Sequence, residues 1–175
     1  MLAQIERKIV NGERINEEEA LFLFNSDEIH IIGQLADEVS KRINHNRVYF
    51  IVNRHINPTN ICINRCRFCA FSRSKGEPGA YEMSIEDIIQ RLKEAEQSSQ
   101  HISEVHIVSG LHPEWSFEDY LNIISAIKKE FPSIGIKAFT AVEVDYFARL
   151  SGLTLEQTLL RLKEAGVDIM PGGGA

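Results

Sequence analysis

All three cysteines of the chain lie within residues 62–69. Cys62, Cys66 and Cys69 have the spacing C-x3-C-x2-C. Clustered thiols in an odd number are typical of metal binding or catalysis in a reducing compartment, rather than of a disulfide. Three thiolates can hold three irons of a [4Fe–4S] cluster, whereas ordinary carriers of this cluster use four cysteines. The spacing therefore predicts a cluster whose fourth iron is open to a ligand, as a catalytic zinc keeps one position open.

The amine and carboxylate of S-adenosylmethionine (SAM) can chelate such an open iron. A reduced cluster can then pass an electron to the sulfonium of SAM and break a C–S bond homolytically. Two alternatives stay open from the spacing alone. One is a zinc site with three cysteines and a histidine, His55 or His112, although structural zinc sites more often use C-x2-C pairs. The other is a set of three buried cysteines without a common role.

The sequence around these cysteines predicts alternating strands and helices, which would position them. Strands are predicted at residues 48–57, 104–110, 134–142 and 167–174. Capping pairs open the helices: Ser84 with Asp87, Ser116 with Asp119, and Thr154 with Gln157 before a helix that ends at Gly166. This alternation favours an α/β fold with a parallel sheet, in which ligands bind at the carboxyl ends of the strands.

Several polar residues lie at those strand ends. His55 is on the strand before the cysteine loop, where it either faces the cluster or is an ordinary core histidine. His112 follows Gly110 after the second strand, as a catalytic group or as part of a rigid turn. Glu143 and, more weakly, Thr140 end the third strand, where a carboxylate could bind the SAM ribose or amine. The alternative for Glu143 is a favourable charge at the start of the next helix.

Four βα units make about half of a closed eight-stranded barrel, which needs ~250 residues. We expect a helical cap at residues 1–45, where Asn16 and Glu19 form a capping pair, and a barrel core at residues 46–175. The last strand would have an unpaired edge. We therefore expect a fragment or a truncated reading frame of a longer enzyme, with an open sheet covered by helices as the alternative.

Composition narrows the class of protein. A hydrophobic fraction of 43% and a charged fraction of 25% are typical of a globular domain. No run approaches ~18 apolar residues, and the amino terminus is too charged for a secretory signal, so we expect a cytosolic protein without membrane segments. The net charge of −6 disfavours nucleic acid as a partner, because phosphate binding needs a basic face.

The cysteine spacing, with Phe68 before the last cysteine, is similar to the signature of the radical SAM superfamily. The segments "NRHINPTNICINRCRFCAFSRSKGEPGAYEMS", "EVHIVSGLHPEWSFEDYL", "IKAFTAVEVDYFARLSGL" and "GVDIMPGGGA" closely resemble the aminofutalosine synthases of the futalosine route to menaquinone. This resemblance covers residues ~45–175. The dehypoxanthine futalosine cyclases and the enzymes of deazaflavin (F420) assembly share the C-x3-C-x2-C-A-F core, and they remain the close alternatives.

The resemblance implies a (β/α) TIM-type barrel with a [4Fe–4S] cluster and SAM as cofactors. Such enzymes cleave SAM to methionine and a 5′-deoxyadenosyl radical, with electrons from an external donor such as flavodoxin or ferredoxin. In the aminofutalosine synthases this radical adds to the enolpyruvyl double bond of 3-[(1-carboxyvinyl)oxy]benzoate. Rearrangement and loss of the carboxyl carbon then give aminofutalosine, so SAM is a co-substrate.

The resemblance also suggests roles for single residues. Expected contacts of the cofactor are Phe68, Ser109, Gly110, Thr140 and Glu143, and candidate catalytic residues are His55 and His112. The family usually has "GGLHP" where this chain has "SGLHP", so Ser109 replaces a glycine near the SAM amine. The family also carries further strands that complete the barrel. We therefore expect turnover to need more than a polypeptide ending at Ala175, and the alternative is an inactive metal-binding fragment.

Overall fold

The computed structural model describes residues 1–98 and 101–172. It separates into two compact units, residues 1–50 and residues 51–175, and each is described by itself. In the described part of the chain, no helix is long and apolar enough to span a membrane.

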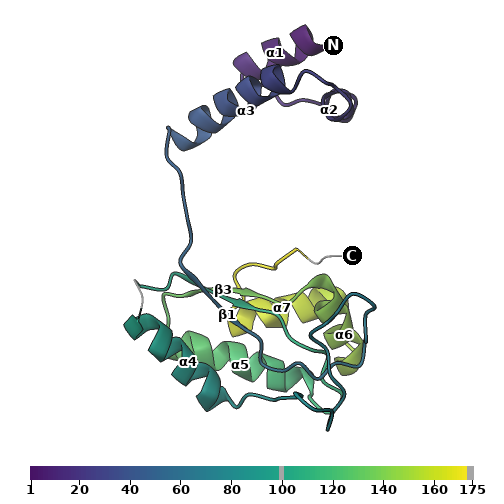
Figure 1. The fold of residues 1–175 in the computed structure, drawn as a ribbon, viewed down its shortest axis with the longest axis vertical. Helices are drawn as coiled ribbons and strands as arrows, with labels where there is room; N and C mark the ends of the chain where they lie inside the picture. The colour runs from purple at the N-terminus through teal and green to yellow at the C-terminus, as the bar shows by residue number, and fades with distance from the viewer. Residues whose placement is uncertain (99–100, 173–175) are drawn as a thin grey trace. The chain divides into compact units, whose positions relative to one another are not determined.

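The first unit, all of whose residues are described, consists of three helices. They are α1 (Leu2–Val10), α2 (Glu17–Phe24) and α3 (Ile29–Asn44) (Figure 1). Ile5 and Ile9 of α1 pack against Leu35 of α3 in a small apolar core. The predicted capping pair is confirmed: the Asn16 side chain accepts the N–H of Glu19, and Glu19 accepts the N–H of Asn16, each at 2.9 Å.

The second unit contains a parallel sheet and four helices in its described residues, 51–98 and 101–172. The strands are β1 (Asn53–Ile56), β2 (Glu104–Ile107) and β3 (Gly135–Ala138), in the order β1-β2-β3. The helices are α4 (Ile85–Ser98), α5 (Phe117–Glu130), α6 (Ala141–Ser151) and α7 (Leu155–Ala165). The predicted α/β class with a parallel sheet is therefore confirmed.

Local sequence explains where these helices begin and end. The Ser84, Ser116 and Thr154 side chains each accept the N–H of the residue three positions on, as the capping pairs predicted. Helix α7 ends at Gly166, whose φ of 118° lies in the left-handed region that favours glycine. The three predicted helices of this unit are thus confirmed.

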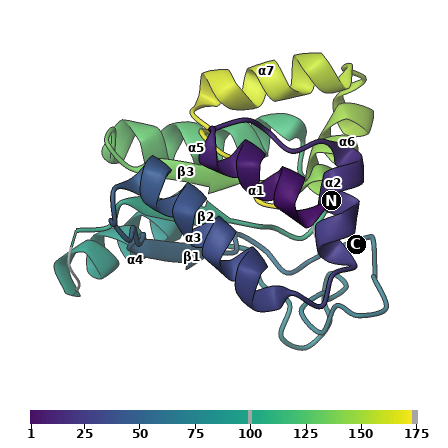
Figure 2. The same ribbon diagram turned by 90° about the horizontal axis from the view of Figure 1, so that it is seen from above.

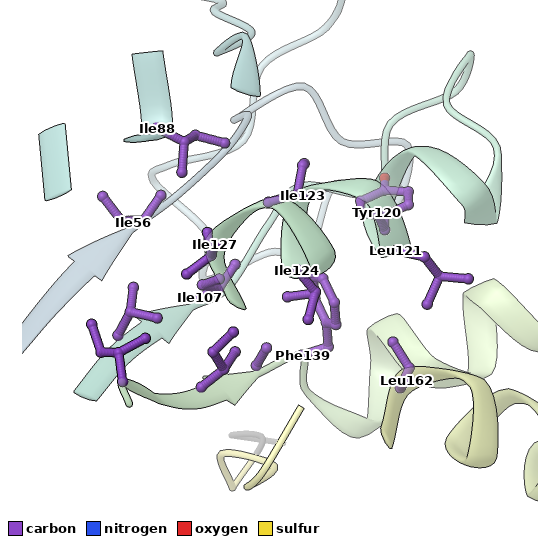
Figure 3. Close-up of a cluster of buried hydrophobic side chains, with 14 of the residues drawn as sticks. Ile56, Ile88, Ile107, Tyr120, Leu121, Ile123, Ile124, Ile127, Phe139 and Leu162 are labelled. Carbon is purple, nitrogen blue, oxygen red and sulfur yellow. The ribbon is translucent and has the colours of Figure 1, made fainter. Parts of the chain in front are cut away.

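The apolar core lies between one face of the sheet and the helices α4, α5, α6 and α7 (Figures 1 and 3). Strand alternation explains this, because neighbouring side chains on a strand point to opposite faces. Val105 and Ile107 of β2 and Ile136 and Ala138 of β3 are completely buried. Figure 3 shows Ile107 pointing toward Ile124 and Ile127 of α5.

The predicted strands are longer than those observed. Residues 48–52 are not in a strand, and β3 ends at Ala138 rather than at residue 142. The reason at β3 is Phe139, whose φ of +63° turns the chain so that Thr140 becomes the N-cap of α6. Thr140 and Glu143 were therefore wrongly placed on a strand.

The fourth predicted strand, residues 167–174, is reduced to one parallel bridge between Ile169 and Lys137 in the described residues. The N–H groups of Asp168 and Ile169 donate to Ile136 O, and the Asp168 side chain accepts the Ile136 N–H at 2.8 Å. Pro171 follows and has no N–H to continue a ladder. Residues 173 and 174 lie outside the described residues.

Candidate functional site

The cysteine loop (residues 62–73) is closed at its base by backbone hydrogen bonds. It leaves the sheet at the carboxyl end of β1. The N–H of Cys62 donates to Arg73 O at 3.0 Å, and the N–H of Arg73 donates to Asn60 O at 2.8 Å. The two ends of the loop are therefore fixed to each other directly beside the first cysteine.

A second set of bonds fixes the segment before the loop. Asn60 is buried, and its side chain donates to Gly79 O at 2.8 Å and accepts the N–H of Tyr81 at 2.9 Å. Thr59 is also buried and donates to Tyr81 O at 2.7 Å. Side chain to backbone bonds of this kind hold irregular backbone in one conformation. Asn60 thus acts as loop scaffolding.

Beyond its base the cysteine loop is open to solvent. Residues 63–71 are all exposed, and Phe68 is 99% exposed. Cys66 and Cys69 are exposed, Cys62 is half-buried, and all three thiols are free. Arg65 donates to Ser74 at 2.7 Å and to Glu77 at 3.1 Å. The cofactor contact predicted for Phe68 remains a prediction.

The thiols have the chemistry that an iron–sulfur cluster requires. Partial burial works to raise the pKa of the Cys69 thiol, but bonds from Ser72 and Phe71 and the positive charge of Arg73 outweigh it, so this pKa is lowered. A lowered pKa favours the thiolate, which is the form that binds metal. Three free thiols on one loop therefore fit an iron–sulfur cluster with three protein ligands.

The zinc arrangement weighed above is not formed by the described residues. No three His, Cys, Asp or Glu side chains among them come close enough together to hold a single ion, and the three cysteines are no exception. His55 of β1 stacks on His106, and His112 after β2 stacks on Trp115. Neither histidine joins the three cysteines in a four-ligand set.

The SGLH segment (residues 109–112) follows β2 and packs directly on the base of the cysteine loop. The N–H of Gly110 donates to Thr59 O at 2.9 Å, and the N–H of Ile63 donates to Leu111 O at 3.0 Å. A Cβ atom at Gly110 would lie 2.3 Å from Ile61 O, far inside contact distance. Only glycine permits this approach, so Gly110 sets the distance between the two loops.

His112 is 1% exposed and is held through its backbone and its ring. Its N–H donates to the Tyr120 hydroxyl and its carbonyl accepts from the Tyr146 hydroxyl, both at 2.9 Å. Its Nδ1 accepts the N–H of Glu114 at 3.1 Å, so a neutral ring carries its proton on Nε2. Nε2 lies 3.1 Å from Glu82 Oε1 without hydrogen-bond geometry, which leaves this nitrogen unpartnered.

The Tyr120 hydroxyl of α5 is a functional group that the sequence did not single out. The hydroxyl donates to Gly110 O at 3.2 Å while accepting the His112 N–H. Burial raises the pKa of Tyr120 well above its usual range, so the hydroxyl stays neutral and can donate. A tyrosine four positions into a capped helix is a weak signal, because aromatic residues on a helix face are usually core.

Glu143 connects the SGLH segment to α6. One carboxylate oxygen accepts the N–H of Ser109 at 2.7 Å, and the other accepts the N–H of Thr140 at 2.7 Å and its hydroxyl at 2.8 Å. Burial raises the pKa of Glu143, although these hydrogen bonds oppose the shift. The Ser109 hydroxyl is buried without a partner among the described residues. Glu143 thus serves the helix start, the alternative weighed above, and SAM contacts at Thr140, Glu143 and Ser109 stay predictions.

The structure brings most of the predicted residues to one end of the sheet. The cysteine loop, the SGLH segment and the start of α6 all lie at the carboxyl ends of β1, β2 and β3. His55 lies within β1, is exposed, and stacks on His106 of β2 at 4.6 Å between ring centroids. A hollow of about 540 Å³ is lined by α7 and the segment after it, including Leu159 and Met170, and holds none of the predicted residues.

Comparison with known proteins gives two kinds of likeness. The sequence profile of the radical SAM superfamily matches residues 56–173. Aminodeoxyfutalosine synthase of Streptomyces coelicolor is 39% identical over 172 residues, which cover 98% of this chain and 44% of that protein. The 5-amino-6-(D-ribitylamino)uracil–L-tyrosine 4-hydroxyphenyl transferase of Methanopyrus kandleri is 45% identical over 144 residues, 82% of this chain and 38% of that protein. The chain thus spans less than half the length of these curated relatives.

A solved structure shares the fold. Methylornithine synthase (PylB) superposes with a TM-score of 0.64 at 19% identity, over 95% of this chain and 46% of that one. At this identity the likeness concerns the fold alone. The parallel strands and outer helices described above therefore correspond to part of a barrel of this type.

Proposed function

Because the chain belongs to the radical SAM superfamily, we propose that Cys62, Cys66 and Cys69 hold a [4Fe–4S] cluster whose open iron binds SAM. The superfamily predicted from the cysteine spacing is thereby confirmed. The observation that carries the proposal is the placement of the three cysteines. All three are free thiols on one loop at the carboxyl end of β1, and the base of this loop is fixed to the SGLH segment. When bound, the cluster and SAM would supply a 5′-deoxyadenosyl radical.

The residues of this chain would position and shield that chemistry. The Asn60 and Thr59 bonds hold the first cysteine in place, and Gly110 brings the SGLH segment against it. Glu143, at the start of α6, accepts a hydrogen bond from the N–H of Ser109 in that segment. The exposed part of the loop leaves room for SAM at the open iron. The lowered pKa of Cys69 favours ligation without a separate base.

For the overall reaction we propose addition of the 5′-deoxyadenosyl group to 3-[(1-carboxyvinyl)oxy]benzoate, which gives aminofutalosine for menaquinone synthesis. The Streptomyces coelicolor relative, similar along 98% of this chain, supports this choice. So do the segments that flank the cysteines, "NRHINPTN", "GLHPE" and "KAFTAVE". We also propose a cytosolic location and a small electron-transfer protein, flavodoxin or ferredoxin, as the reductant.

A second reaction is supported by the Methanopyrus kandleri relative, whose identity of 45% is higher over a shorter span. That protein is named as a transferase acting on tyrosine and a ribitylaminouracil. The same cysteine loop would serve either reaction. The mass of the product formed from each substrate pair distinguishes the two.

The proposal is tested by anaerobic reconstitution with iron and sulfide, followed by EPR of the reduced protein. We expect a [4Fe–4S]⁺ signal that changes when SAM is added. Turnover is assayed with 3-[(1-carboxyvinyl)oxy]benzoate and SAM in a protein that has the complete barrel, where we expect a product with the mass of aminofutalosine. Formation of 5′-deoxyadenosine alone would overturn the substrate and leave the radical chemistry standing. Uptake of zinc, or a cluster indifferent to SAM, would overturn the SAM site.

A further inference from the structure

Three basic side chains form a row across the sheet, on the face away from the helices. His55, His106 and Lys137 occupy matched positions on β1, β2 and β3 in the parallel register. Each lies one residue after or before a buried apolar residue, so their side chains share the opposite face from the core. We call these three residues the basic row.

Among the described residues, Lys137 and His106 of the basic row have no carboxylate bonded to them. None of the ion pairs among the described residues includes Lys137. The Nε2 atom of His106 is buried without a hydrogen-bond partner in the same set of residues. Burial lowers the pKa of His106, and the positive charges of His55 and Lys137 lower it further. Glu104, two residues before His106 on β2, is the one carboxylate that the three strands place on this face.

The unpartnered Nε2 atom of His106, beside the ammonium of Lys137, points to an anionic ligand. Buried polar groups are nearly always hydrogen-bonded in folded proteins, so the Nε2 atom of His106 calls for a partner. A carboxylate placed between the three side chains would accept hydrogen bonds from them, and the bond from the Lys137 ammonium would be charge-assisted.

The position of the row fits a substrate bound below the cluster. In (β/α) barrels the helices lie outside, so the face of the sheet away from them is the inner face. From above, Figure 2 shows β1, β2 and β3 side by side with α5 and α7 beyond them. The row lies one residue before the last residue of each strand, whereas the cysteine loop begins beyond the strand ends.

The position of the row, one residue inside the strand ends, indicates which of the two substrate carboxylates it would bind. The double bond of 3-[(1-carboxyvinyl)oxy]benzoate must lie near the SAM site, at the strand ends. The benzoate carboxylate is meta to the ether oxygen, so the ring separates it from the double bond and it could reach one strand residue farther into the barrel. Resting on the proposed function, we propose that the basic row binds the benzoate carboxylate of the substrate and so fixes the reacting double bond toward SAM.

Two ligands and one substitution test the proposal. The protein, reconstituted and loaded with SAM, is titrated in a calorimeter with 3-[(1-carboxyvinyl)oxy]benzoate and with 2-phenoxyprop-2-enoate, which lacks the benzoate carboxylate. We expect Lys137→Met to weaken binding of the first ligand about 10- to 100-fold, the usual range for a lost charge-assisted hydrogen bond. Binding of the second ligand should change less than about twofold, because it makes no such bond.

Matched variants separate charge from packing. Lys137→Arg keeps the charge and should retain most of the affinity. Lys129→Met removes an exposed lysine of α5 and should leave both affinities unchanged. His55→Gln, at an exposed position where misfolding is not expected, should weaken only the benzoate ligand, by several-fold. Thermal unfolding of each variant confirms that the fold is intact.

The outcomes distinguish this inference from the proposed function. If the wild-type protein responds to SAM by EPR but does not bind 3-[(1-carboxyvinyl)oxy]benzoate, the proposed substrate is wrong. If the wild-type protein binds it and forms the product, while Lys137→Met binds it equally well, the basic row has no part in recognition. Equal weakening of both ligands by Lys137→Met would also overturn the inference, since the effect would not depend on the benzoate carboxylate.

Discussion

The cysteine loop and the SGLH segment lie against each other but differ in how they are held. Residues 63–71 of the cysteine loop are exposed, and two of its thiols are open to solvent. In the SGLH segment, residues 110–112 are buried, Gly110 and His112 are hydrogen-bonded to Tyr120, and His112 is also bonded to Tyr146. The proposed cluster ligands thus lie on the exposed cysteine loop, and the SGLH segment that supports this loop is buried and hydrogen-bonded.

The difference indicates that the two segments have different roles: the cysteine loop binds the cluster, and the SGLH segment holds the base of that loop in place. A cluster bound by the cysteine loop would stabilise the protein, because a ligand that binds the folded state raises the free energy of unfolding. A buried segment whose backbone is hydrogen-bonded to neighbouring elements is fixed before the cofactor arrives. We therefore expect changes in the cysteine loop to affect cluster binding with little effect on folding, and changes in the SGLH segment to affect both.

The largest effect is expected for Cys66→Ala. Loss of one of three ligands should abolish the EPR signal of the reduced, reconstituted protein, since no described residue offers a replacement thiol. The melting temperature of the metal-free protein should stay unchanged, because the side chain is exposed. Arg67→Ala, in the same loop, is the control and should retain the signal. A metal-free protein destabilised by Cys66→Ala would show that the loop is part of the folded core.

Gly110→Ala should affect folding and cluster binding together. The added methyl group would lie 2.3 Å from Ile61 O, and the atom it meets is backbone that cannot rotate away. We expect a loss of about 3 kcal/mol in the free energy of unfolding, the upper range for overpacking. Urea unfolding of the metal-free protein measures it.

Gly33→Ala is the control for this substitution. A Cβ at Gly33 of α3 meets no atom within 4 Å, so this change should stabilise its helix by about 0.5–1 kcal/mol. Iron content after reconstitution should fall only for Gly110→Ala. If both variants bind the cluster equally, the contact at Gly110 does not position the cysteine loop.

Two tyrosines allow a finer test of the SGLH segment. Tyr120→Phe removes two hydrogen bonds to buried backbone, at His112 and Gly110, and should lower the free energy of unfolding by about 2 kcal/mol. Tyr146→Phe removes one bond to the His112 carbonyl from a half-buried position and should cost about 1 kcal/mol. Equal losses in urea unfolding would show that the buried position of Tyr120 adds nothing.

Local patterns predicted much of this arrangement. The cysteine spacing indicated the family, and the pairs at Asn16, Ser84, Ser116 and Thr154 marked helix starts, because a capping box is a contact between residues three apart. Contacts between distant residues were not predictable in this way. The Ser109–Glu143 bond joins residues 34 positions apart, and only the folded sheet brings them together.

Strand ends were the least predictable feature, since apolar residues continue past them. The third strand looked continuous through residue 142, but Phe139 adopts a left-handed conformation that its residue type does not favour. Packing of its ring against Tyr120 and Phe147 accompanies that conformation. The consequence reaches the site, because Thr140 and Glu143 became helix-start residues.

The smallest effect expected is on the pH dependence of the free energy of unfolding, which should differ between the buried carboxylate of Glu143 and the exposed carboxylate of Asp87. Burial raises the pKa of Glu143 above its ordinary value of 4.5, so the folded protein holds this proton after the unfolded chain has lost it. The contribution of Glu143 to stability should therefore fall as pH rises from the ordinary value through the raised one. Glu143→Gln, which has no such proton, should reduce this fall.

Asp87 provides the opposite case in an equivalent position, three residues after the helix-capping Ser84. Hydrogen bonds from Ser84 lower the pKa of Asp87 below its ordinary value of 3.8. Its contribution is present above the ordinary value and is lost as pH falls through the lowered one. Urea unfolding of the wild type, Glu143→Gln and Asp87→Asn, between about pH 3 and about pH 7, should give differences from the wild type with opposite slopes. Slopes of the same sign would mean that the Ser109 and Thr140 bonds outweigh burial at Glu143, and that the SGLH segment is anchored by a carboxylate charged throughout this range.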